Sequence, residues 1–184
     1  MAEIKLISEA LFKEESPIRT DTGVQEFVPY IGIAQKMYIN KVLGAPLVAE
    51  LEAQIKQAQA TPNADPYPIT PHNQALLKEI APALSYYAVY QGLPFHWAAI
   101  QNKGLTLGKS ENSDAVDLKS LAQLRRWVKD DAEFLLNNLI EYLCTCGVNY
   151  PLWKPGNYCG GCGCEGDKKS NPGEDFGIFI PNRR

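Results

Sequence analysis

The stretch DLKSLAQLRRWVKDDAEFLLNNLIEYL, residues 117–143, decides the fold class of this 184-residue chain. Its apolar residues recur every three or four positions, which is the spacing of one face of an α-helix. Asp117 is a residue type that caps helix N-termini, and a helix from there to residue 143 is about 40 Å long. Such a helix needs partner helices along its length, so the sequence predicts a mainly α fold. The stripe consists of Leu118, Leu121, Leu124, Val128, Ala132, Leu135, Leu139 and Leu143.

Three helices are expected upstream, and together with the last one they predict an antiparallel bundle of about four helices. The first has Pro29 in its first turn, where proline is tolerated, and Gly44 at its end, where glycine is favoured. The third contains Pro82, which should kink it. A proline-rich surface loop separates the second helix from the third. The three helices are predicted at 27–43, 46–60 and 73–92.

The remaining segments are expected to be appendages of this bundle. Residues 99–107 predict a short β-hairpin. Beyond residue 147 the chain is rich in Gly, Pro, Cys and Asn without helical periodicity, and residues 176–180 predict a single strand that seeks a sheet on this subunit or the next. We therefore expect an N-terminal arm, a helical bundle domain and a Cys/Gly-rich, extended C-terminal arm, at residues 1–23, 24–147 and 148–184.

The composition excludes several classes of protein. With 45% apolar and 21% charged residues, the chain has enough apolar residues to form an ordinary globular core. Its net charge is −3, whereas a free nucleic-acid binder shows a basic excess or a basic stripe. No stretch approaches the roughly 20 uninterrupted apolar residues of a membrane helix, and the N-terminus lacks the apolar region of a secretory signal. We expect a protein made in a cytoplasm, without a membrane partner.

Five cysteines in such a chain favour reduced thiols or a metal site over a disulfide framework. They form two groups separated by a loop, which is the layout of a structural, tetrahedral zinc site. A zinc held by four thiolates has no open position for catalysis, so its role would be structural. The alternative is free thiols in a glycine-rich tail, with the first cysteine packed in the core. The candidate zinc ligands are Cys146, Cys159, Cys162 and Cys164, with Cys144 as an alternative ligand.

Few residues suit catalysis. The two histidines are His72, expected to be a capping or surface residue at a helix start, and His96, expected to pack against its aromatic neighbours. Neither forms part of a recognisable Ser/His/Asp or Cys/His group. The Gly-Lys-Ser at 108–110 superficially matches the end of a phosphate-binding loop. However, the two glycines of this segment, Gly104 and Gly108, lie only four residues apart, which does not fit that motif. We expect a non-enzymatic protein with no catalytic residues.

Several longer patterns follow one another between residues 25 and 152. They are FVPYIxxAQxxYIxxxLG at 27–44, LSYYAxYxxLPF at 84–95, IQNKG at 100–104 followed by NSDAV at 112–116, and LRxxxxxxAEF at 124–134 followed by LIxYL at 139–143. In this order and spacing the patterns resemble the small helical head–tail connector or adaptor (neck) proteins of tailed bacteriophages. The resemblance is greatest to those of phages and prophages of Bacteroidota hosts.

This resemblance implies a helical subunit that forms a homo-oligomeric ring, a dodecamer, beneath the portal protein. The ring joins the portal to the tail or to a second neck protein, and DNA passes through its lumen without sequence-specific binding. The implied location is the neck of the virion, after synthesis in the host bacterial cytoplasm. An acidic subunit without basic patches suits that role, because DNA slides past such a surface. Extended arms suit it as well, because they reach the neighbouring subunits of a ring.

The competing interpretation is a small cytosolic zinc-binding module that regulates or binds nucleic acid, with the helices as its scaffold. It predicts a basic face near the cysteines, and the charges around residues 154–169 do not supply a clear one. Assembly separates the two interpretations. A connector forms a large cyclic assembly or docks on a portal, whereas the module stays a monomer or a dimer.

Overall fold

The structure is a computed structural model that describes residues 4–18, 24–101, 104–107 and 117–154. These residues are mainly helical, which confirms that part of the predicted fold class. In chain order the elements are α1 (Glu9–Glu15), the 3₁₀ turn η1 (Val24–Glu26), α2 (Val28–Ala34), the π-helical turn η2 (Gln35–Ile39), α3 (Asn40–Leu43), α4 (Ala45–Ala60), α5 (Pro71–Trp97), β1 (Ala98–Gln101), β2 (Gly104–Leu107), α6 (Leu118–Cys146) and the 3₁₀ turn η3 (Gly147–Asn149).

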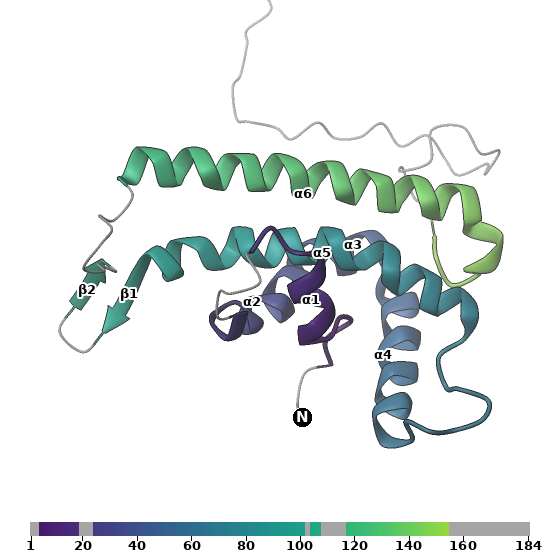
Figure 1. The fold of residues 1–184 in the computed structure, drawn as a ribbon. Coiled ribbons are helices and arrows are strands. Elements are labelled where there is room, and N and C mark those ends of the chain that lie inside the picture. Colours follow the sequence, from purple (N-terminus) through teal and green to yellow (C-terminus); the bar gives the residue numbers. More distant parts are fainter. Residues whose placement is uncertain (1–3, 19–23, 102–103, 108–116, 155–184) are drawn as a thin grey trace, which may run out of the picture.

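Helix α5 is the centre of the fold. The two longest helices, α5 and α6, run side by side in opposite directions, and α1, α2 and α4 lie on the side of α5 away from α6 (Figure 1). Because neighbours cover α5 on several sides, it must be apolar on more than one face. Its residues Ile80, Ala81, Leu84 and Ala88 are fully buried.

Helix α6 forms where it is predicted, but Leu118 and Leu124 of the predicted apolar stripe are exposed. The Asp117 side chain accepts a hydrogen bond from the Ser120 main-chain N–H at 3.3 Å, so Asp117 is the N-cap that the sequence predicts. The contact with Ser120 also lowers the pKa of this carboxyl group. The helix ends at Cys146, three residues after the last member of the predicted stripe and at the cysteine pair expected to end it. Its inward face buries Leu121, Val128, Ala132, Leu139 and Leu143.

The helix predicted at 27–43 is a continuous helical run with an irregularity in its middle. Helices α2 and α3 are joined by η2, a single π-helical turn that begins at Gln35. A π turn places one more residue in the loop closed by each hydrogen bond, so the side chains after it are rotated relative to those before it. The run ends at Gly44, whose φ of 78° lies in the left-handed region, as predicted for a helix-ending glycine.

The packed body extends beyond residues 24–147 at both ends. Leu6, Ile7 and Phe12, from the expected N-terminal arm, belong to the hydrophobic core. So do Tyr150 and Trp153, which follow η3. A fully buried Leu or Phe contributes roughly 1.5–3 kcal/mol to stability, so these segments matter for the fold. At the far end of α5, β1 and β2 pair in antiparallel fashion, with Ala98, Ala99, Ile100 and Gln101 opposite Leu107, Thr106, Leu105 and Gly104.

Candidate functional site

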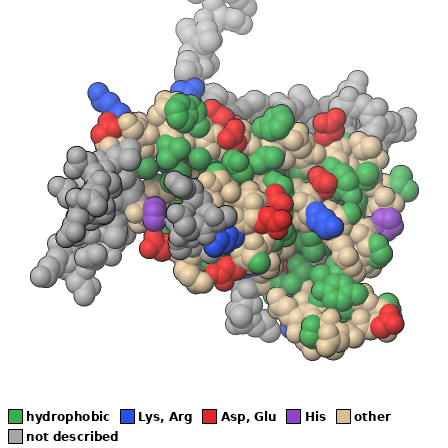
Figure 2. Space-filling model, viewed as in Figure 1, with side chains coloured by type: hydrophobic (Ala, Val, Ile, Leu, Met, Phe, Trp, Pro, Cys, Tyr) green, Lys and Arg blue, Asp and Glu red, His purple; other side chains and the backbone are tan. Residues whose placement is uncertain are grey.

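Three large apolar side chains along α6 are exposed to solvent. Leu124, Trp127 and Phe134 are 43%, 58% and 65% exposed. Trp127 and Phe134 are seven residues apart, so both lie on one helix face, and Leu124 lies one turn before Trp127. Figure 2 shows hydrophobic side chains among acidic ones along the upper edge of the molecule, where Figure 1 places α6. We call these three residues, with Asp130 and Asp131, the α6 strip.

The two acidic residues of the α6 strip lie between its aromatic rings. Asp130 and Asp131 follow Trp127 by three and four residues and precede Phe134 by four and three, so both neighbour both rings. Both aspartates are exposed. A ring face attracts cations, and a carboxylate binds them through charge-assisted hydrogen bonds. The α6 strip is therefore suited to a partner that carries apolar and cationic side chains.

A small pocket of about 200 Å³ adjoins Leu124 at one edge of the α6 strip. His96 lies at this pocket, with its Nδ1 atom 2.6 Å from Glu26 Oε2 and its ring 5.2 Å from that of Phe27. The histidine therefore packs against an aromatic ring, as predicted, although the ring is that of Phe27. The lining is mostly apolar and consists of Pro17, Ile18, Phe27, Val89, Leu93, His96, Leu124 and Val128.

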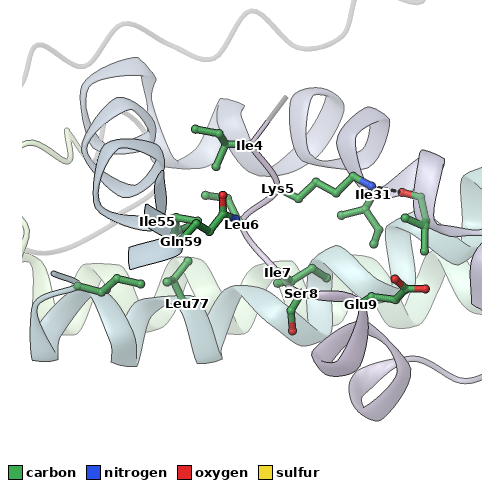
Figure 3. A pocket seen from close by; sticks show the side chains of 12 residues that line it. Ile4, Lys5, Leu6, Ile7, Ser8, Glu9, Ile31, Ile55, Gln59 and Leu77 are labelled. Carbon is green, nitrogen blue, oxygen red and sulfur yellow. Dashed lines mark hydrogen bonds between the residues drawn. The ribbon is translucent and has the colours of Figure 1, made fainter. Parts of the chain in front are cut away.

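A second site holds the N-terminal segment itself. Residues 4–8 run without helical structure beside α2, α4 and α5, and together with residues of these helices they line a pocket of about 540 Å³ (Figure 3). Gln35, which is 1% exposed, accepts a hydrogen bond from Leu6 N–H at 2.9 Å through Oε1 and donates to the Ile4 carbonyl at 3.2 Å through Nε2. Lys5 donates to the Val28 carbonyl at 3.0 Å, the contact marked by the dashed line in Figure 3. We call this arrangement the Gln35 clasp.

The segment after α6 is anchored in a similar way. The Trp153 indole N–H donates to the Val42 carbonyl at 2.9 Å, and the Tyr150 hydroxyl donates to the His72 carbonyl at 2.8 Å. Tyr142 and Tyr150 share a 3.0 Å contact between their hydroxyl groups. Burial, above all, raises the pKa of Tyr150. His72 thus lies at the start of α5, as predicted, and contributes its main-chain carbonyl to this anchor.

Stacked aromatic rings join η2 to α5. The rings of Tyr38 and Tyr87 lie 3.8 Å apart, and Gln91 donates to the Tyr38 hydroxyl at 2.7 Å. Burial raises the pKa of Tyr87 to about 12. Beside them, the Arg125 guanidinium lies 4.3 Å from the centre of the Tyr90 ring, a cation–π contact between α6 and α5. This cluster fixes α6 on α5 and so sets the direction in which the α6 strip faces.

The predicted zinc ligands are only partly within the described residues. Cys144 and Cys146 end α6; Cys144 is disulfide-bonded, whereas Cys146 is a half-buried free thiol. The disulfide differs from the expectation of reduced thiols, and its sulfur is not a thiolate while the bond is intact. Cys159, Cys162 and Cys164 lie outside the described residues, so the zinc site stays a prediction. Among the described residues, no group of three or more His, Cys, Asp or Glu side chains is placed to hold a metal ion.

Sequence reasoning misses the residues that dominate these sites. The two aromatic rings of the α6 strip were detectable, because Trp127 and Phe134 lie outside the predicted apolar stripe, whereas Leu124 belongs to that stripe and its exposure was not foreseen. Gln35 gives no comparable signal, since an isolated glutamine in a helix is ordinarily solvated. The Gly-Lys-Ser at 108–110 lies outside the described residues.

One of three comparisons with known proteins finds a match. Residues 39–163, more than half of the chain, match the family described as "Family of unknown function (DUF6712)". No curated protein and no solved structure shows a significant match. Among the described residues, no helix combines the length and the apolar character that crossing a bilayer requires.

Proposed function

We propose that this chain, which belongs to the DUF6712 family of unknown function, is a non-enzymatic head–tail connector of a tailed bacteriophage. In this proposal its copies form a ring of about twelve between the portal and the tail or a second neck protein. DNA passes through the lumen without sequence-specific contacts, and the protein belongs to the neck of the virion. The subunit is an antiparallel bundle of about four helices, with a short hairpin and a C-terminal arm that reaches its neighbours, whereas the expected N-terminal arm packs on the subunit's own core.

The observation that carries the proposal is the exposure of Trp127 and Phe134. Aromatic residues of this size bury roughly 150–250 Å² each when they are covered, and leaving that surface in water is unfavourable. Isolated apolar residues on a surface need no explanation, but several large ones along one helix face indicate an interaction site. Aromatic residues are also enriched at the centres of protein interfaces. A subunit of a larger assembly accounts for this surface.

Both ends of the described chain are anchored to the body, which suits a subunit that keeps its shape within a larger assembly. The Gln35 clasp fixes the N-terminal segment, and Trp153 fixes the segment that precedes residues 155–184. Trp153 therefore gives the end of the described residues a defined place on the body, which suits a C-terminal arm directed at a neighbouring subunit. The net charge of −3 also suits a lumen that does not retain DNA.

Electron microscopy of the 184-residue protein, alone and mixed with the portal protein encoded near it, tests the proposal. We expect rings stacked on the portal, and light scattering should give a mass of many subunits. The variant Trp127→Ser should reduce assembly, whereas Tyr67→Ser, which changes an aromatic residue that is 48% exposed elsewhere, should leave assembly unchanged. Both variants should keep the helical circular-dichroism signal.

The opposite outcome is equally clear. Protein that stays monomeric with and without the portal would remove the connector assignment. If that monomer also contained about one zinc per chain, released by a chelator together with reactive thiols, the zinc-binding module would replace the connector. A ring that contains the same zinc would add a structural metal to the connector.

A further inference from the structure

We propose that the α6 strip of one copy packs on the outer face of α2, η2 and α3 of the next copy. This inference rests on the proposed function and names the contact that would build the ring. The second face carries Ile33, which is 45% exposed, and Met37, which is 42% exposed and lies four residues further on. Lys41, also exposed, follows Met37 by four residues. We call Ile33, Met37 and Lys41 the α2–α3 face.

The two surfaces match in chemistry. The α6 strip offers two aromatic rings with two carboxylates between them, and the α2–α3 face offers a thioether and an aliphatic side chain beside an ammonium group. Sulfur atoms and cations both make favourable contacts with aromatic rings. The only charged residues between 27 and 49 are Lys36 and Lys41, so this part of the chain carries positive charge alone. Opposite charges across an interface speed association and select the register.

The two surfaces also lie on different sides of the molecule. Helix α5 packs against α6 on one side and against α2 on another (Figure 1). Trp127 and Phe134 lie on the side of α6 away from its buried residues. A contact between two different surfaces is heterologous, so each copy keeps one surface of each kind for a further neighbour. Such contacts continue from copy to copy and close into a ring when the rotation allows it.

A symmetric pairing of two α6 strips is the obvious competitor, and electrostatics disfavours it. That arrangement would bring Asp130 and Asp131 of one copy toward the same residues of the other. Like charges placed together in an interface cost free energy and suppress the wrong pairing. The α2–α3 face has no such conflict, because Lys41 would lie among the carboxylates.

A charge exchange tests the contact. Asp131→Lys and Lys41→Asp should each weaken assembly of the 184-residue protein by about tenfold in dissociation constant, because each places like charges together. The double variant should recover wild-type assembly to within about threefold, since each copy again presents opposite charges to its neighbours. The matched controls are Glu79→Lys and Lys78→Glu, which reverse exposed charges on α5. They should behave like the wild type.

The readouts are light scattering over a concentration series at low salt and electron microscopy with the portal. Single variants that assemble like the controls, or a double variant that is no better than the single ones, would overturn the inference while rings in the wild type still support the connector. Loss of assembly on removing residues 155–184, with no effect of the charge exchange, would show that this segment and not the α6 strip builds the contact, and would overturn the inference. A wild type that never assembles would overturn the inference together with the proposed function.

Discussion

Replacing Gln35 by leucine should detach the N-terminal segment from the body. Gln35 is 1% exposed, and its side chain serves the Leu6 N–H, the Ile4 carbonyl and the Glu52 carboxylate at 2.9, 3.2 and 3.3 Å. Leucine has a similar volume, so the change removes these hydrogen bonds without leaving a large cavity. The Leu6 N–H is the group that loses most, because Leu6 is only 4% exposed. Any effect on stability is therefore mainly an effect of the clasp.

The magnitude follows from which groups water can reach afterwards. A buried donor left without an acceptor costs about 1–3 kcal/mol, whereas the half-buried Ile4 carbonyl and Glu52 carboxylate regain water at smaller cost. We expect a loss of about 2–3 kcal/mol. With a denaturant slope of about 2 kcal/mol per molar urea, the unfolding midpoint should fall by roughly 1 M or more.

Urea unfolding followed by circular dichroism measures this loss. The matched control is Gln59→Leu, which changes an exposed glutamine that lines the pocket beside residues 4–8 and should shift the midpoint little. The variant Gln35→Glu refines the test: it should be less destabilising at pH 4.5 than at pH 7.5, because a protonated carboxyl group again carries a donor and does not repel Glu52. Equal midpoints for Gln35→Leu and Gln59→Leu would refute the clasp as a source of stability.

Three further predictions concern the ends, the packing and the titration of the fold. Trp153→Phe should lower stability by about 1–2 kcal/mol, because the Val42 carbonyl loses its buried donor, whereas removal of residues 155–184 should leave the urea midpoint unchanged. Gly92→Ala should lower the melting temperature, because the new Cβ atom would lie 2.6 Å from the Phe27 ring. Such overpacking costs about 1–3 kcal/mol. A rise in melting temperature, which is usual for Gly→Ala in a helix, would contradict this prediction. Burial raises the pKa of Tyr87 from 10.0 to about 12, so the Tyr87 hydroxyl loses its proton at lower pH in the unfolded chain than in the folded one. The free energy of unfolding should therefore fall as the pH rises from about 10 to about 12. In Tyr87→Phe it should fall less steeply over the same range.

Local pattern predicts the helices well where one residue decides the outcome. The apolar stripe and the cap at Asp117 place α6, and Gly44 ends the run of α2, η2 and α3 at the predicted residue. Helix α4 begins one residue before its predicted start and ends where predicted. Helix α5 is longer than predicted, since it runs from Pro71 to Trp97 and contains Pro94 as well as Pro82. The packing of α5 against its neighbouring helices stabilises the helix by more than the second proline destabilises it.

Contacts between distant residues explain what the sequence does not reveal. The partner of the Leu6 N–H is a side chain 29 residues away, and the partner of the Trp153 indole is a carbonyl 111 residues away. The periodicity of the sequence gives no sign of such distant pairs, which is why the sequence predicts arms at both ends of the chain. The outward position of Trp127 follows from the helical period, but its exposure depends on what α5 covers. The α2–α3 face depends further on the turn that begins at Gln35, for which the sequence has no local signal.

The Gln35 clasp also has a consequence for the order of events on the ribosome. The segment at Ile4–Leu6 is synthesised about 30 residues before Gln35, the residue that binds it. At roughly 5–20 residues per second, this segment waits about 2–6 seconds for that partner. An apolar stretch that waits exposed is prone to associate with other chains, and flanking charges reduce that risk. Lys5 is such a charge within the apolar stretch, and in the finished protein the same ammonium group binds the Val28 carbonyl.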